Sequence, residues 1–154
     1  MPDWRTPFEE IKIGEGRKIK AGSDLAILSL GPLGNFAVKA CEELERQGIH
    51  AGLFDMRFAK PLDEALLHEI FQSYNRIMTL EDGCLQGGFG SAVLEFMTDN
   101  GYNSQVKRLG IPDSIVEHGE PAELYQECGI DTPSIVAASM EFMQRQSRVA
   151  SVLH

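Results

Sequence analysis

An α/β fold, with a mostly parallel sheet between two layers of helices, is the architecture that this sequence predicts. Candidate strands such as LAILSL at 25–30 are apolar throughout instead of alternating with polar residues, which indicates a sheet buried on both faces. Strand-like and helix-like segments alternate along the chain with short links, as they do in parallel sheets. Right-handed crossovers are therefore expected between the strands.

The first strand–helix–strand unit is expected between residues 25 and 56. The strand at 25–30 is broken by GPLG, and a helix follows at 35–47. Apolar residues at the spacing i, i+3, i+4 and i+7 give this helix one buried face, namely Ala37, Ala40, Cys41 and Leu44. Gly48 suits the left-handed conformation that commonly ends a helix, and 49–56 is the next strand candidate.

The middle of the chain predicts a helix in KPLDEALLHEIFQSY, residues 60–74, with acidic residues in its first turn, where the helix dipole favours negative charge. Its inward stripe is expected to consist of Leu62, Leu66 and Ile70. Strands are expected at 76–80 and 105–111, with a helix at 91–98 between them. The inward residues of that helix are expected to be Val93, Phe96 and Met97.

Two further helices are expected near the C-terminus, at 121–127 and from 133 to about 146. Thr132 and Pro133 have the residue types that favour the N-cap and the first position of a helix. The apolar stripe of the last helix is expected to be Ile135, Ala138 and Phe142.

The chain divides by composition into an arm, a body and a tail. Residues 1–22 are polar and are expected to form an arm, continuing from a missing upstream domain, with a short edge strand. The folded domain is placed at 23–146, and residues 147–154 are expected to fray. Met1 before PDWRTPFEE is interpreted as an engineered start within a longer chain.

Composition narrows the classes of function. The chain has 154 residues and a formal net charge of −9, so it repels polyanions and nucleic acid is not an expected partner. No run of 18 apolar residues suggests a membrane helix, and the N-terminus lacks a secretory apolar segment, so a cytoplasmic protein is expected. Three cysteines without C-x-x-C spacing predict buried or half-buried free thiols in a reducing compartment, without a metal or disulfide framework.

The glycine-rich stretch EDGCLQGGFGSAVLEF, residues 81–96, poses the main functional question, because such turns can hold phosphate. A Walker A loop beginning at Gly83 would require Lys where Phe89 stands. A dinucleotide loop beginning at Gly88 and Gly90 lacks its last glycine. Both nucleotide interpretations are therefore weak.

We expect the glycines of this stretch to permit close backbone approach, and its carboxylates to fill the anion position of the following helix. The hypothesis is that Glu81, next to Asp82, accepts hydrogen bonds from N–H groups of the loop or helix. Gly87, Gly88 and Gly90 are then close-packing positions, with a domain or subunit contact nearby.

His118 is the histidine of greatest interest, because its loop PDSIVEHGEP follows a predicted strand, and such loops carry ligand sites in α/β folds. Asp113 and Ser114 lie close in sequence, but no G-x-S-x-G elbow is present to support a hydrolase. His118 is expected to order the loop or to lie at an interface.

Four stretches together resemble one family: PDWRTPFEEIKIGEGR, DMRFAKPLDEALL, TLEDGCLQGGFGSAVLEF and RLGIPDSIVEHGEPAELYQECGID. They are similar to C-terminal domains of the 1-deoxy-D-xylulose-5-phosphate synthase family, within the transketolase superfamily of thiamine-diphosphate enzymes. The E-D-G-x-x-x-G-G-F-G-S pattern fits the whole superfamily, whereas GIPDxxxEHG and DMRFxKPLD indicate the synthases. The resemblance covers nearly all of residues 2–146.

The resemblance implies a homodimeric, three-domain transferase that uses thiamine diphosphate and Mg²⁺. Such enzymes condense pyruvate with D-glyceraldehyde 3-phosphate, with release of CO₂, for non-mevalonate isoprenoid synthesis and for thiamine and pyridoxal synthesis. The G-D-G…N cofactor motif and the catalytic glutamate are implied to lie in two other domains. For this chain we therefore expect no catalytic, cofactor-binding or metal-binding residue, and a role in packing and dimer formation. The expected structural or interface residues are Glu81, Asp82, Gly87, Gly88, Gly90, Asp113 and His118.

The resemblance also implies a five-stranded sheet, with an antiparallel edge strand at about 11–20 and four parallel strands. Two rival interpretations stay open. One is a stand-alone interaction module related to the C-terminal domain of 2-oxo-acid dehydrogenase β subunits. The other is an independent anion-binding or hydrolase domain. An isolated domain of the synthase type is expected to be inactive, to self-associate through exposed apolar faces, and to come from the cytoplasm, or from a plastid if the parent is a plant enzyme.

Overall fold

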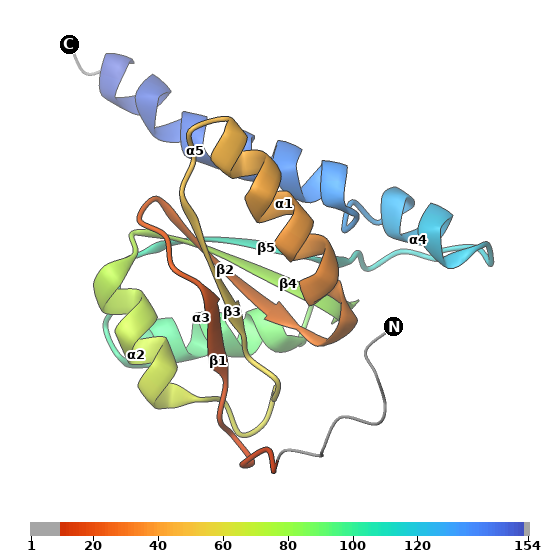
Figure 1. Cartoon of the computed structure of the whole chain (residues 1–154), viewed down its shortest axis with the longest axis horizontal. Coiled ribbons are helices and arrows are strands. Elements are labelled where there is room, and N and C mark those ends of the chain that lie inside the picture. The colour runs from red at the N-terminus through yellow and green to blue at the C-terminus, as the bar shows by residue number, and fades with distance from the viewer. Residues whose placement is uncertain (1–9, 153–154) are drawn as a thin grey trace.

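A five-stranded sheet forms the centre of the computed structural model, which describes residues 10–152, with side chains as far as residue 144 (Figure 1). The strand order is β1-β3-β2-β4-β5. The strands are β1 (Arg17–Lys20), β2 (Leu25–Leu30), β3 (Ala51–Asp55), β4 (Arg76–Cys84) and β5 (Gln105–Ile111). Strand β1 pairs antiparallel with β3 and the other pairs are parallel, which confirms the predicted sheet with one antiparallel edge strand.

Helices cover both faces of the sheet and complete the three predicted layers (Figure 1). They are α1 (Gly34–Arg46), α2 (Glu64–Ser73), α3 (Phe89–Asp99), α4 (Pro121–Glu127) and α5 (Thr132–Val152), with a 3₁₀ turn at Gly31–Leu33. Helices α1 and α5 pack on one face around Leu25, Ile27 and Leu80. Helices α2 and α3 pack on the other face around Ala26, Leu28 and Ile77. Alternate residues of the same strand thus belong to two hydrophobic cores, one on each face of the sheet. This is why the strands are apolar at every position.

Helix α1 matches its prediction closely. Ala37, Ala40, Cys41 and Leu44 are all buried, and Gly48 has a φ of 78° just beyond the helix. In α2 the buried face is different from the predicted stripe. Ile70 is buried, but its partners are Leu67 and Phe71, while Leu62 and Leu66 are only partly buried. The reason is that α2 begins at Glu64, so Leu62 precedes the helix and does not share its periodicity.

Both ends of α5 also differ from the prediction. Asp131, and not Thr132, caps the helix, because its carboxylate accepts the Ser134 N–H at 3.0 Å. The Thr132 hydroxyl instead donates to the Phe36 carbonyl at 3.3 Å. Helix α5 continues to Val152, past the expected end near residue 146, and no glycine or proline interrupts that stretch. The fraying expected at 147–154 stays a prediction. Residues 1–9 and 153–154, where the arm begins and the tail ends, lie outside the described residues.

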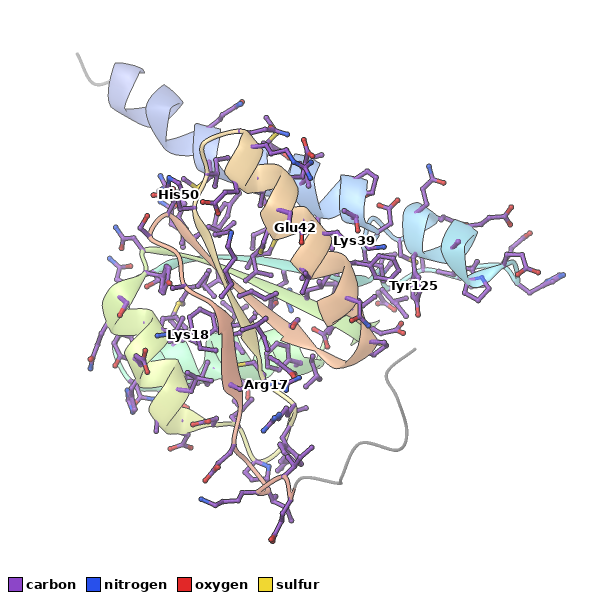
Figure 2. All side chains as sticks on the ribbon, in the orientation of Figure 1. Arg17, Lys18, Lys39, Glu42, His50 and Tyr125 are labelled. Atoms are coloured by element: carbon purple, nitrogen blue, oxygen red, sulfur yellow. The ribbon has the colours of Figure 1, made fainter. Side chains whose placement is uncertain are left out.

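The residue before the edge strand β1 is held to the body of the domain by Asp63. This carboxylate accepts the Leu66 N–H at 2.9 Å as the N-cap of α2, and its other oxygen accepts the Gly16 N–H at 2.8 Å. A side chain at Gly16 would meet Leu66 at 2.8 Å and the Asp55 carbonyl at 3.0 Å. Along β1, Arg17 pairs with Asp55 at 3.1 Å and Lys18 with Glu69 at 2.8 Å (Figure 2).

Candidate functional site

The turn from β4 into α3 lies at the carboxyl edge of the parallel strands, where ligand sites of α/β folds are usually found. Its central contact is the Glu81 carboxylate, which is only 3% exposed. One oxygen accepts the Phe89 N–H at 2.6 Å and the other accepts the Gly90 N–H at 2.9 Å. The hydrogen bonds expected from Glu81 are therefore confirmed, and the anion position at the start of α3 is filled by the protein itself.

Two glycines allow α3 to begin this close to the sheet. A Cβ atom at Gly88 would lie 2.1 Å from the Cys84 carbonyl oxygen and 2.2 Å from the Glu81 carboxylate. One at Gly90 would lie 2.5 Å from the Thr79 hydroxyl. Gly87 is different, because no atom lies within 4 Å of the place where its Cβ would stand. Only its positive φ of 74° favours glycine there. Close packing is thus the physical reason for Gly88 and Gly90.

A second set of hydrogen bonds holds the outer part of the turn. Arg108 on β5 donates to the Ser91 hydroxyl at 2.8 Å and also to the Leu85 carbonyl. Ser91 in turn donates to the Leu85 carbonyl at 3.1 Å and accepts the Gly87 N–H at 3.0 Å. Neither Arg108 nor Ser91 was among the residues predicted from the sequence. The signal available was slight, because Arg108 and the neighbouring Lys107 are two adjacent cations in an otherwise mostly apolar strand.

Asp82 points to a different neighbourhood from Glu81, and it is exposed. Its carboxylate accepts a hydrogen bond from the Tyr125 hydroxyl at 3.0 Å, and this bond raises the pKa of Tyr125. Tyr125 also makes an edge-on contact with the Phe36 ring at 5.4 Å, where α4 meets the rest of the domain (Figure 2). Asp82 therefore links the end of β4 to α4, and Tyr125 is a further residue that the sequence analysis missed.

A cavity of about 460 Å³ opens beside the Asp82–Tyr125 pair. Its walls are largely apolar and come from the end of β5, the loop at 112–120, α4 and the approach to α5. They include Ile111, Val116, Leu124 and Ile130, with Asp82 and His118 among the polar contributors. The structure thus brings Asp82 and His118 to one cavity, although they are far apart in sequence.

A catalytic triad is not assembled around His118. His118, Asp113 and Ser114 are all exposed, and within the described residues no hydrogen bond joins the histidine to either of the others. Asp113 is not among the residues that line the cavity. The geometry gives a hydrolase no activated nucleophile.

Metal-binding and thiol chemistry are likewise limited in the part of the chain that the structure describes. No group of three or more His, Cys, Asp or Glu side chains there could hold a metal ion. Cys41, Cys84 and Cys128 are free thiols. Cys41 is buried and Cys128 half-buried as expected, whereas Cys84 is exposed, and burial raises the pKa of Cys41 to about 11. Of the helices described, none is long and apolar enough to cross a membrane.

Comparison with known proteins gives matches over most of the chain. The model of the transketolase C-terminal domain family matches residues 14–135. A 1-deoxy-D-xylulose-5-phosphate synthase from Cytophaga hutchinsonii is 60% identical over 135 residues, which cover 88% of this chain and 21% of that protein. The synthase from Parabacteroides distasonis is 54% identical with the same coverage. The chain therefore spans about a fifth of the length of the curated relatives that it matches.

Solved structures agree with the fold. A chain described as a split-gene transketolase, inactive β4 tetramer, has a TM-score of 0.83 and 31% identity. The match covers 93% of this chain and 46% of that one. The transketolase of Campylobacter jejuni has a TM-score of 0.60 at 16% identity, which shows a likeness of fold alone.

Proposed function

Because this chain belongs to the transketolase C-terminal domain family, we propose that it is the C-terminal domain of a 1-deoxy-D-xylulose-5-phosphate synthase. The observation that carries the proposal is the 60% identity to the Cytophaga hutchinsonii synthase across nearly the whole domain. Identities of 54% and 50% to the synthases of Parabacteroides distasonis and Phocaeicola vulgatus support it.

The parent enzyme in this proposal joins two three-carbon substrates and releases one carbon. Pyruvate loses CO₂, and its remaining two-carbon unit forms a carbon–carbon bond with the aldehyde of D-glyceraldehyde 3-phosphate. The product, 1-deoxy-D-xylulose 5-phosphate, serves isoprenoid and thiamine synthesis. Thiamine diphosphate, bound with Mg²⁺, supplies the electron sink that decarboxylation requires.

The residues of this chain do not fit that cofactor. The sequence contains no G-D-G motif, and the described residues offer no cluster suited to Mg²⁺. The anion position that a diphosphate could use at α3 is taken by the Glu81 carboxylate. The role proposed for this domain is therefore packing within a soluble homodimer, and the isolated domain is proposed to be inactive.

A chimera tests the proposal. The matching C-terminal region of the Cytophaga hutchinsonii synthase is replaced by this chain, and formation of 1-deoxy-D-xylulose 5-phosphate is measured with both substrates, thiamine diphosphate and Mg²⁺. We expect the chimera to be active and this chain alone to give no product above a blank. A folded but inactive chimera would contradict the assignment, and turnover by the isolated chain would contradict its inactivity.

A second candidate is that the domain belongs to a separately encoded subunit. The likeness to the split-gene transketolase favours this candidate, because the match covers 93% of the length of the present chain. The coding sequence upstream of Met1 separates the two candidates. An in-frame extension that encodes G-D-G supports the single-chain synthase, whereas a stop codon supports a subunit or an interaction module.

A further inference from the structure

The apolar cavity beside Asp82 is open to solvent in this domain, and we propose that it receives an apolar side chain flanked by Lys or Arg from the rest of the parent enzyme. The inference rests on the proposed function, because the occupant belongs to the part of the synthase outside this chain. That part is large, since the chain spans 21% of the length of its relatives.

Helix α4 gives the first support. None of its described residues is buried, although Leu124 and Tyr125 carry substantial apolar surface and line the cavity. Helix α4 and the loop before it project from the end of the sheet (Figure 1). A short helix without a buried side chain gains little stability from its own domain, because helices of this length depend on tertiary packing. A partner packed against Leu124 would supply the missing contact.

The loop between β5 and α4 gives the second support. Ile115 is 95% exposed, more than any other large apolar side chain in the described part of the chain. Next to it, Val116 turns to the cavity wall. The most exposed large apolar side chain of the described residues is thus next in sequence to a wall residue of an open apolar cavity, and exposed apolar surface of this kind marks interaction sites.

Charge at the cavity defines the chemistry of the occupant. Asp82 and Glu117 line it, Glu120 and Glu123 lie close by in sequence, and none of the lining residues is Lys or Arg. Among the described residues, the Tyr125 hydroxyl donates to one carboxylate oxygen of Asp82, and the other oxygen can accept a hydrogen bond from a cation. Acidic groups around an apolar cavity favour an apolar side chain with basic neighbours and disfavour anionic ligands.

The first experiment uses the chimera and a photocrosslinker. Benzoylphenylalanine replaces Ile115 in one version and Gln126 in a control, because Gln126 is exposed on α4 but does not line this cavity. Irradiation and mass spectrometry then identify the crosslinked peptide. We expect position 115 to crosslink to a segment of the synthase upstream of this domain that has an apolar residue flanked by Lys or Arg, and position 126 to crosslink far less.

A charge variant sharpens the result. Leu124→Glu should reduce the crosslink from position 115 by about tenfold, whereas Gln126→Glu should leave it unchanged. An active chimera without the crosslink, or with a crosslink to an acidic segment or a second copy of this domain, would overturn the inference and leave the proposed function standing. A folded but inactive chimera would count against the proposed function instead.

A measurement on the chain alone decides the inference if the chimera fails to fold. Cys128 lines the cavity, so its alkylation rate reports on occupancy. The peptide acetyl-Lys-Trp-Lys-amide at millimolar concentration should slow alkylation of Cys128 but not of the exposed Cys84. Equal or greater protection by acetyl-Glu-Trp-Glu-amide, or no protection by either peptide, would overturn the inference.

Discussion

The connections from β4 to α3 and from β5 to α4 leave the same edge of the sheet, but only the first has its polar groups and surface satisfied within the domain. After β4, the turn closes on itself, because Glu81 occupies the N–H groups of α3 and Arg108 holds the outer loop. After β5, the chain leads to α4 without burying any described residue of that helix, and a cavity stays open. The glycine-rich sequence that looks most like a ligand site is therefore architecture. The less conspicuous loop carries the surface available for contact.

The closed turn should be the more sensitive of the two regions, and Gly88→Ala should have the largest effect. The added Cβ would lie 2.1 Å from a backbone carbonyl that cannot move cheaply, so we expect a loss of about 3 kcal/mol in the free energy of unfolding. Urea denaturation measures it. Gly101→Ala is the matched control, since its φ is 70° but nothing lies within 4 Å, and it should cost about 1 kcal/mol. Equal losses would show that close packing at Gly88 is unimportant.

Removal of the Glu81 charge should have the next largest effect. In Glu81→Gln, the amide cannot accept from two N–H groups as a carboxylate does, so we expect a loss of about 2 kcal/mol. Glu95→Gln, on the exposed side of α3, should change stability by less than about 0.5 kcal/mol. In Glu81→Ala, formate should restore part of the lost stability by supplying a carboxylate. A fully stable Glu81→Gln variant would show that the turn does not depend on this charge.

The closed turn was predictable from sequence to a greater extent than the open cavity. Glu81 stands directly before a glycine-rich helix start, so its hydrogen bonds follow from local sequence and helix electrostatics. The sheet was equally accessible, because apolar strands and one-sided helices are local patterns. Arg108 was missed because its partners, Ser91 and Leu85, belong to another connection and meet it only when β4 and β5 pair.

The cavity is formed by residues that lie far apart in the sequence, and no local sequence pattern predicts that they meet. Asp82 and Tyr125 are 43 residues apart. Asp82 lies in the part of β4 between Leu80 and Cys84, where the register with β5 is irregular. The prediction of Thr132 as the N-cap of α5 was wrong for a related reason. Thr132 is a good capping residue, but its hydroxyl is used by Phe36, on a helix far away in sequence, which leaves the cap to Asp131.

At the open cavity, Tyr125→Phe should destabilise the domain only slightly, by about 0.5 kcal/mol, because the Asp82–Tyr125 pair is exposed. The hydrogen bond to Asp82 raises the pKa of Tyr125 above its ordinary value, so it favours the protonated phenol. Its contribution to stability is present below the pKa of the unfolded chain and is lost as pH rises through the folded value. Ultraviolet titration of Asp82→Asn should show a phenol that ionises at lower pH than in the unmodified protein. An unchanged titration would indicate that the two side chains do not interact in solution.

Cysteine labelling compares the two regions without any substitution. It is therefore the prediction with the smallest expected effect on the stability of the domain. Cys84 lies exposed at the end of β4, whereas Cys128 is half-buried in the cavity wall, where burial raises its pKa. Iodoacetamide at pH 8 should therefore modify Cys84 first and Cys128 more slowly. Cys41 should react last, because a thiol with a pKa of about 11 is ionised in only about one molecule in a thousand at that pH. In urea the three rates should converge, since the unfolded chain removes the differences in burial. A faster reaction of Cys128 than of Cys84 in the folded chain would contradict the exposures that this structure gives to the two thiols.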